Sequence, residues 1–265
     1  MKWVVLMDEQ YPLIDEKCAP FLLVGGEHAL VLTHGFTGSP AHMRKIAQAL
    51  NEAGFTVCGV RLSGHGTDIR DMLKCTYRDW LMDVSLATEK MLREYPVVSV
   101  AGLSMGGVLS LIMAQEYGQR LAGCITLSAP MGTRSPRHLG PALGLVCPVL
   151  KGKKGDRSML DSAYDLGYPD IPLRKMHDLN VLIDRAKSNL SRITCPLLAV
   201  QSKSYEVISQ NSLQIITKGV SSAVKEELWL EKSPHVLTLT EETPLAADAM
   251  ARFLRAAQLQ TKWRK

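Results

Sequence analysis

The stretch VSVAGLSMGGVLSL, residues 98–111, constrains the fold more than any other part of the chain. It joins an apolar run typical of a buried strand to a run typical of a helix, with Gly102, Ser104 and Gly106 at the junction. A strand that passes directly into a helix needs a sharp turn, and small neighbours relieve the crowding around a serine with unusual φ and ψ angles. The pattern predicts Ser104 at the tip of that turn, where it can act as a nucleophile. The alternative is a glycine-rich helix N-terminus capped by a serine.

The surrounding sequence indicates an α/β fold. Short apolar runs typical of buried strands lie at residues 29–33, 55–60, 97–101 and 121–127. Between and after them, helices are predicted at about residues 39–53, 77–94, 104–117 and 243–259. This alternation predicts a mostly parallel sheet of about seven or eight strands with helices on both faces.

The character of the chain changes after Pro130. Residues 131–192 are rich in Gly, Pro and charge and have weaker periodicity, and the strand pattern resumes at residues 196–201. We therefore interpret residues 131–192 as a small inserted cap, or lid, and residues 1–130 and 193–265 as the core domain. A chain of 265 residues can bury one large core and still carry such an insertion.

Composition argues against several classes of protein. The charged fraction of 22% and the hydrophobic fraction of 46% indicate neither disorder nor a membrane span. The net charge of +5 comes from scattered Lys and Arg, with short basic clusters only at residues 151–154 and at the C-terminus, so we expect no nucleic-acid partner. Asp8 and Glu9 interrupt the first apolar run, so we expect no secretory signal and a cytoplasmic protein without stable membrane insertion.

Metal and cofactor sites have no support in the sequence. The six cysteines include no CxxC pair, so we expect them to be reduced and to bind no zinc. The chain has no HExxH motif, no P-loop and no dinucleotide fingerprint. We predict no metal and no cofactor.

A second motif, LTHGFTGSP at residues 32–40, follows an early strand and precedes a predicted helix. An HG pair in this place is typical of a loop that stabilises an oxyanion through backbone N–H groups. We expect one donor from Met105, directly after Ser104, and the other from Phe36. His34 is expected to orient the loop without transferring protons.

A histidine for general-base catalysis is predicted from the third motif, KSPHVLTL at residues 232–239. His235 follows the last strand and precedes the last helix, so it can reach Ser104 from the far side of a cleft. The other histidines do not have this placement. We expect His65 in a tight turn, and on the surface or in the cap His28, His42, His138 and His177.

Together these motifs resemble those of the small bacterial carboxylesterases and monoacylglycerol lipases of the α/β-hydrolase superfamily. The motifs that match in order and spacing are HGFTGS, RLSGHG, DW, AGLSMGGVLSL, SAPM and SPHVLTL, and they cover nearly the whole chain outside the cap. The resemblance implies an α/β-hydrolase fold in which Ser104 is the nucleophile, His235 the base, and Phe36 and Met105 the oxyanion donors. It also implies a lid that forms an acyl-binding tunnel.

Two positions depart from the pattern of this family. Pro234 replaces the glycine that usually precedes the catalytic histidine. Where the family has an aspartate after the seventh strand, this chain has Tyr205 followed by Glu206. Glu206 is our candidate for the acid that orients His235, since Asp and Glu both serve in this fold. Other interpretations are Tyr205 acting through its hydroxyl, a more remote role for Glu231, or no acid at all.

The sequence thus favours a serine carboxylesterase that hydrolyses small-molecule esters of short to medium acyl chains through an acyl-enzyme on Ser104, with monoacylglycerols as one candidate substrate. One alternative is a hydrolase-fold ligand-binding or sensing protein whose turnover is impaired because Tyr205 occupies the position of the usual aspartate. A further alternative is a thioesterase or acyltransferase that uses the same serine. The sequence favours no particular oligomeric state.

Overall fold

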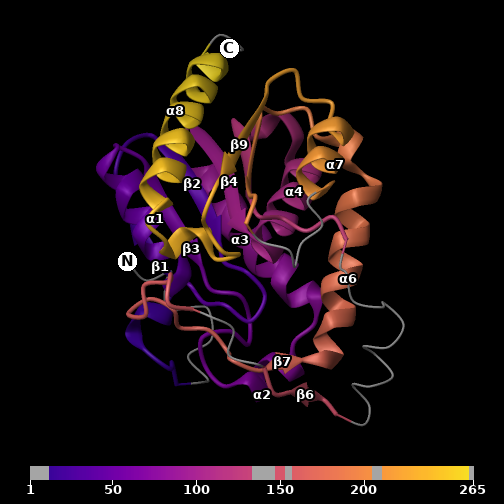
Figure 1. Ribbon diagram of the computed structural model, residues 1–265. Coiled ribbons are helices and arrows are strands. Elements are labelled where there is room, and N and C mark those ends of the chain that lie inside the picture. The colour runs from indigo at the N-terminus through magenta and orange to yellow at the C-terminus, as the bar shows by residue number, and fades with distance from the viewer. Residues whose placement is uncertain (1–11, 133–146, 153–156, 205–210, 263–265) are drawn as a thin grey trace.

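A seven-stranded sheet with helices on both faces forms the centre of the computed structural model, which describes residues 12–132, 147–152, 157–204 and 211–262 (Figure 1). Its strands are β1 (Phe21–Leu23), β2 (His28–Thr33), β3 (Thr56–Val60), β4 (Val97–Leu103), β5 (Gly123–Leu127), β8 (Leu197–Ser202) and β9 (Lys225–Leu230). The helices are α1 (Ala41–Glu52), α2 (Ile69–Lys74), α3 (Tyr77–Glu94), α4 (Met105–Tyr117), α6 (Leu173–Ser188), α7 (Asn211–Gly219) and α8 (Thr243–Lys262). The predicted α/β class is confirmed.

The order of the strands brings the ends of β2 and β4 together. The sheet runs β1-β3-β2-β4-β5-β8-β9, and every pair is parallel except β1 with β3. Thr33, the last residue of β2, pairs with Gly102 near the end of β4. In parallel sheets, ligands bind outside the carboxyl ends of the strands. The loops that follow Thr33 and Leu103 therefore meet where a site is expected.

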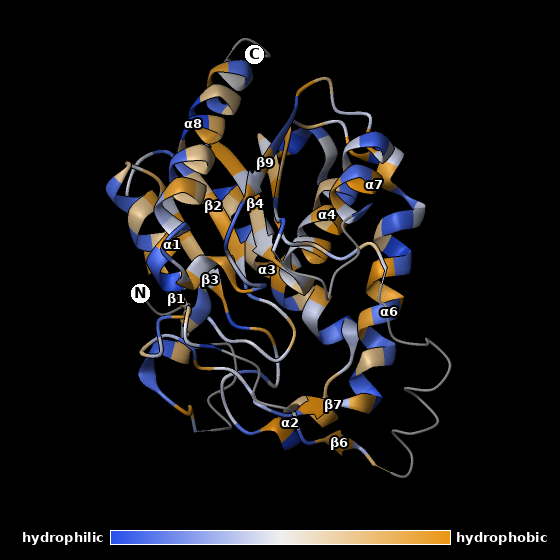
Figure 2. Cartoon of the chain, viewed as in Figure 1, coloured by the Kyte–Doolittle hydropathy of each residue, from blue (hydrophilic) through white to orange (hydrophobic). Residues whose placement is uncertain are grey.

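Two hydrophobic clusters hold the layers together. Helices α1 and α8 cover one face of the sheet, and α3, α4 and α6 cover the other (Figure 1). The central strands β2, β3, β4, β5 and β8 are buried along their whole length, as expected for parallel strands covered on both sides. Figure 2 shows apolar residues concentrated on these strands and hydrophilic residues on the outer surfaces of the helices.

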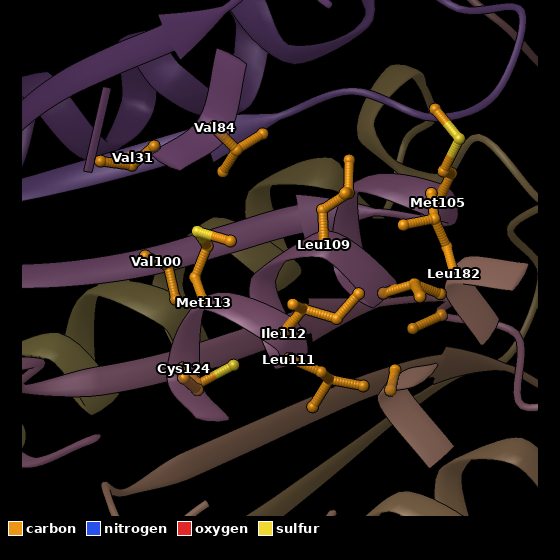
Figure 3. Close-up of a cluster of buried hydrophobic side chains, with 14 of the residues drawn as sticks. Val31, Val84, Val100, Met105, Leu109, Leu111, Ile112, Met113, Cys124 and Leu182 are labelled. Carbon is orange, nitrogen blue, oxygen red and sulfur yellow. The ribbon is translucent and has the colours of Figure 1, made fainter. Parts of the chain in front are cut away.

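Helix α4 is the most deeply buried helix of the described part of the chain. All residues from Met105 to Gln115 are buried, so the helix has no polar face. Figure 3 shows its side chains between Val31, Val100 and Cys124 of the sheet and Leu182 of α6. The position of Ser104, directly before α4, is therefore fixed by packing on several sides.

The interval 131–192 contains two described parts. Strands β6 (Val149–Leu150) and β7 (Ile171–Pro172) form a separate antiparallel pair. Helix α6 packs against α4, and its Leu182, Ile183 and Ala186 belong to the same hydrophobic cluster as the sheet. The division into a core and an inserted cap stays a prediction, and α6 contributes to the packing of the core.

In the described part of the chain, no helix is both long and apolar enough to cross a membrane. Among the same residues, no three His, Cys, Asp or Glu side chains form a group that could hold a metal ion.

His28 lies in the sheet and not on the surface, so our expectation for it was wrong. It begins β2, is only 2% exposed, and its Nε2 lies 2.9 Å from Ser99 Oγ on β4. Its ring also packs edge-on against Phe55, 5.4 Å between centroids. Because burial disfavours the charged imidazolium, it lowers the pKa of His28 from 6.5 to about 4.

This pKa predicts a loss of stability in acid. Between pH 6.5 and about 4 the unfolded chain binds a proton at His28 that the folded chain does not, so the free energy of unfolding falls as the pH falls through this window. Between pH 7.5 and 5, wild type should lose about 2 kcal/mol more than His28→Gln, which cannot bind that proton. Urea unfolding of both proteins at the two pH values measures the difference, and equal losses would contradict the prediction.

Candidate active site

Ser104 sits at the turn between β4 and α4 in a strained conformation. Its φ is 53° and its ψ is −116°, a region that residues with a side chain rarely adopt. Its backbone N–H donates to Leu127 O at 2.7 Å, and its C=O accepts from Val108 N–H at 3.1 Å. Leu103 and Met105 on either side are buried, while Ser104 is partly exposed. The predicted strand–turn–helix is therefore present, and the serine faces outward from it.

The two glycines of the motif are explained by close backbone contacts. A Cβ atom on Gly102 would lie 2.2 Å from the carbonyl carbon of Gly106. A Cβ atom on Gly106 would lie 2.2 Å from Thr33 O and 2.6 Å from His34 O. No side chain fits at these distances, so glycine at both positions allows α4 to approach the ends of β2 and β4.

Both predicted oxyanion donors, Phe36 and Met105, belong to segments that adjoin Ser104. Met105 is the first residue of α4, and the N–H groups in a first helical turn have no partner within the helix. Phe36 belongs to the loop after β2, which passes so close to the serine that a Cβ atom on Gly35 would lie 3.2 Å from Ser104 Cβ. The partial positive charge at the N-terminus of α4 also favours a negative charge beside Ser104.

His34 holds the peptide group that carries the Phe36 N–H. Its Nε2 accepts from Leu62 N–H at 3.2 Å, so the proton is on Nδ1, which donates to Gly35 O at 2.9 Å. Gly38 N–H donates to the same oxygen at 3.1 Å. Because C=O and N–H point in opposite directions in a trans peptide, fixing Gly35 O on one side turns the Phe36 N–H to the other. Burial and the neighbouring His65 keep the pKa of His34 well below 6.5, so the ring stays neutral. These contacts agree with the predicted loop-orienting role.

His235 lines the pocket together with residues of the Phe36 loop. It follows β9, and it lines the same pocket of about 480 Å³ as Ser104 and Phe36. Burial, and to a smaller extent the neighbouring His42, lower the pKa of His235 to about 4. The imidazole is therefore neutral at pH 7, which is the form that can accept a proton.

One wall of this pocket is a segment that we call the strap, residues 157–172. Tyr168 N–H donates to Thr37 O at 2.8 Å, and Leu166 O accepts from Ser39 Oγ at 2.5 Å, so the strap is attached to the loop of Phe36. At its other end Asp161 N–H donates to Leu239 O at 3.0 Å, close to His235. The strap thus joins the two loops that carry the predicted catalytic groups.

The phenol of Tyr168 attaches the strap to the turn at residues 64–67. Its hydroxyl donates to Gly64 O at 2.8 Å and accepts from Thr67 N–H at 3.1 Å. His65, as predicted, lies in the tight turn between them, and its ring stacks on that of Tyr168 at 6.3 Å between centroids. These contacts hold the RLSGHG turn against Tyr168, which lines the pocket.

His42 is a pocket residue that the sequence analysis missed. We expected it on the surface or in the cap, but it is 4% exposed, lies on α1 and lines the pocket. Its Nε2 is 3.4 Å from Asp165 Oδ1, and Arg157 approaches the same carboxylate at 2.5 Å. Burial acts to raise the pKa of Asp165, but His42 and Arg157 together hold it below its usual value. The sequence did hold a signal for this burial. His42 follows Pro40 by two residues and precedes Ile46 by one helical turn, so both side chains lie on the same, buried face of α1.

The predicted acid is not among the described residues. Tyr205 and Glu206 both lie outside them, so the assignment of Glu206 stays a prediction. Glu231 is described. Its side chain is 64% exposed and its carboxylate lies 2.6 Å from Lys203 Nζ. This exposed ion pair gives Glu231 no visible link to the pocket.

Comparison with known proteins identifies relatives over nearly the whole chain. The family model described as serine aminopeptidase, S33, matches residues 26–243. The thermostable monoacylglycerol lipase of Bacillus sp. strain H-257 is 33% identical over 247 residues, which cover 93% of this chain and 98% of that protein. The carboxylesterase of Bacillus subtilis strain 168 is 29% identical, covering 89% of this chain and 95% of that protein.

Solved structures give the same picture. A structure reported with the metagenome-derived lipolytic enzymes LipS and LipT is 32% identical, has a TM-score of 0.85, and covers 91% of this chain and 98% of its own. The monoacylglycerol lipase of Paleococcus ferrophilus, at 16% identity and a TM-score of 0.75, shares the fold. The predicted α/β-hydrolase fold is therefore confirmed.

The strain at Ser104 predicts an unusual effect on stability. Replacing Ser104 by glycine removes the side chain that is strained at φ 53°, whereas alanine keeps the Cβ atom, and both variants lack the hydroxyl. The strain is worth about 1–3 kcal/mol, and the freedom that glycine adds to the unfolded chain offsets about 0.5–1 kcal/mol of it. Ser104→Gly should therefore be more stable than Ser104→Ala by about 1 kcal/mol in urea unfolding. Equal stability would mean that the turn is not strained.

Proposed function

Because the chain belongs to the serine aminopeptidase S33 family of α/β-hydrolases, alongside bacterial monoacylglycerol lipases and carboxylesterases, we propose that it is a serine esterase of small carboxylic esters. The observation that carries the proposal is that Ser104, on a strained turn, and the neutral His235 line one pocket. Its substrates would be esters of short to medium acyl chains, with monoacylglycerols among them.

In the proposed reaction, Ser104 Oγ attacks the carbonyl carbon of the ester while His235 takes the hydroxyl proton. The carbonyl oxygen becomes an oxyanion, which the N–H groups of Phe36 and Met105 stabilise. His235 then returns the proton to the leaving alcohol, and an acyl-enzyme remains on Ser104. Water attacks this acyl-enzyme with His235 again as base, and the carboxylic acid is released.

Within this proposal, Glu206 orients His235. An acid beside the imidazole would hold the correct tautomer and stabilise the imidazolium that forms during the reaction. It would also raise the pKa of His235, which burial and, to a smaller extent, His42 lower to about 4. Glu206 lies three residues after Lys203, whose N–H donates to Leu230 O at the end of β9, immediately before the loop of His235.

The composition of the pocket supports esters with an apolar acyl chain and a polar alcohol. Leu160, Ile171 and Val236 supply apolar surface, while His42 and Arg157 supply hydrogen-bonding groups. A glycerol alcohol carries free hydroxyls that such groups can bind. This is the observation that favours monoacylglycerols among the candidate esters.

Removing the hydroxyl of Ser104 tests its role as the nucleophile. On nitrophenyl esters from acetate to decanoate, wild type should turn over many times, and Ser104→Ala should lose at least about 10⁴-fold in kcat/KM because no acyl-enzyme can form. A fluorophosphonate should add to Ser104, as read by peptide mass spectrometry. An adduct elsewhere, or an active Ser104→Ala, would overturn the assignment. An adduct without multiple turnover would instead favour the binding protein that the sequence left open.

Removing the charge of Glu206 tests its role as the acid that orients His235. Glu206→Gln should lower kcat by about 10³- to 10⁴-fold, because the amide can hold the ring but cannot stabilise the imidazolium. Glu231→Gln, which changes an exposed carboxylate, is the matched control and should keep wild-type activity. Loss in Glu231→Gln alone would move the role of the acid to Glu231, and full activity of both variants would mean that neither serves as the acid.

A further inference from the structure

Glu242, a residue with no assigned role, is bound by the turn that leads to His235. It precedes α8, and its carboxylate accepts from three consecutive backbone N–H groups. The distances are 3.0 Å from Glu231 N, 3.0 Å from Lys232 N and 2.7 Å from Ser233 N. Ser233 Oγ adds a fourth hydrogen bond at 2.6 Å. Successive N–H groups that converge in this way form an anion-binding nest.

The carboxylate is ionised in this nest. Burial acts to raise the pKa of Glu242, but the bond from Ser233 Oγ and the three from backbone N–H groups together lower it below its usual value. Charge-assisted hydrogen bonds of this kind are about twice as strong as neutral ones. Ser233 is 1% exposed, so water has little access to its side of the nest, whereas the bonds from Glu231 N–H and Lys232 N–H lie at the surface. Four hydrogen bonds to an ionised carboxylate thus hold the turn at residues 231–233 to Glu242.

The same residues close the loop on its other side. Ser233 Oγ lies 2.9 Å from Thr240 Oγ1, and Glu242 N–H donates to Thr240 Oγ1 at 3.3 Å. Thr243 Oγ1 donates to Leu237 O at 3.1 Å. His235 thus lies in a short loop, residues 233–240, whose two ends are held together by Glu242 and its immediate partners.

The turn is also attached to the end of β8. Ser202 Oγ donates to Ser233 O, and Ser204 Oγ donates to Glu231 O. These serines directly precede the segment of Glu206. The contacts of Glu242 therefore lie between the two segments that the proposed reaction needs in register.

We propose that Glu242 is a positioning residue that sets the place of the His235 imidazole relative to Ser104. The inference rests on the proposed function of that site. Glu242 is absent from the pocket lining, so it acts through the loop and not through the substrate. Misplacement of a reacting group by about 1 Å can cost about 100-fold in rate. Its loss should therefore lower kcat and leave KM nearly unchanged.

The test compares Glu242→Gln with Glu241→Gln. Glutamine keeps the size of the side chain but removes the charge, and Glu241 is the exposed neighbour that serves as a matched control. On a nitrophenyl ester, at a temperature where both variants are folded, Glu242→Gln should lose about 10- to 100-fold in kcat with KM within about twofold. Glu241→Gln should match wild type. A lower melting temperature with unchanged kcat, or a change in KM alone, would overturn the proposal.

A second measurement does not depend on ester turnover. The pKa of the His235 ring, which burial lowers, should rise toward 6.5 in Glu242→Gln as the loop opens to water, and should stay unchanged in Glu241→Gln, as followed by proton NMR. An unmoved pKa in Glu242→Gln would contradict a positioning role. Failure of the proposed function would instead be seen in wild type, as a protein that neither hydrolyses esters nor takes the fluorophosphonate on Ser104.

Discussion

The close approach of α4 to the ends of β2 and β4 is the contact on which the rest of this site depends. Gly106 touches Thr33 O and His34 O, and Gly102 faces Gly106, at distances that leave no room for a Cβ atom. This approach forces Ser104 into its strained conformation and aims the N-terminus of α4 at the pocket. It also places the loop of Phe36 directly beside the serine. The proposed nucleophile, the N-terminus of α4 and the loop of the proposed oxyanion donor Phe36 are thus positioned by one backbone contact.

Those parts of the fold that rest on local patterns could be predicted from the sequence. The buried strands read as apolar runs because both of their faces are covered, and the strand–turn–helix at Ser104 could be recognised because Gly102 and Gly106 are required by backbone geometry. The loop-orienting role of His34 also followed from its motif, and its two hydrogen bonds to the backbone bear this out.

The remaining parts depend on contacts between segments far apart in the chain. His42 is buried in part because the strap, which includes Asp165, lies against it, and its spacing to Ile46 predicts a buried helix face but not this cover. In the sequence, Glu242 resembles any acidic residue before a helix. Only the fold brings the turn at residues 231–233 into contact with its carboxylate. The packing of α6 against α4 likewise depends on segments that only the fold brings together. Glu206 lies outside the described residues, so its role rests on the sequence alone.

The burial of α4 on every side has a consequence for how the protein is made. A helix without a polar face gains little from forming alone, and it needs β2, β5 and α6 around it before its apolar surface is hidden. During synthesis α4 leaves the ribosome before α6 and β8 have been synthesised. The apolar surface of α4 therefore stays exposed for a time on the order of seconds. Parallel strand pairing between distant segments slows the later steps as well. We therefore expect the nascent chain to be most prone to aggregation at α4, directly after the proposed nucleophile Ser104, and chaperones that bind apolar segments would have their main target there.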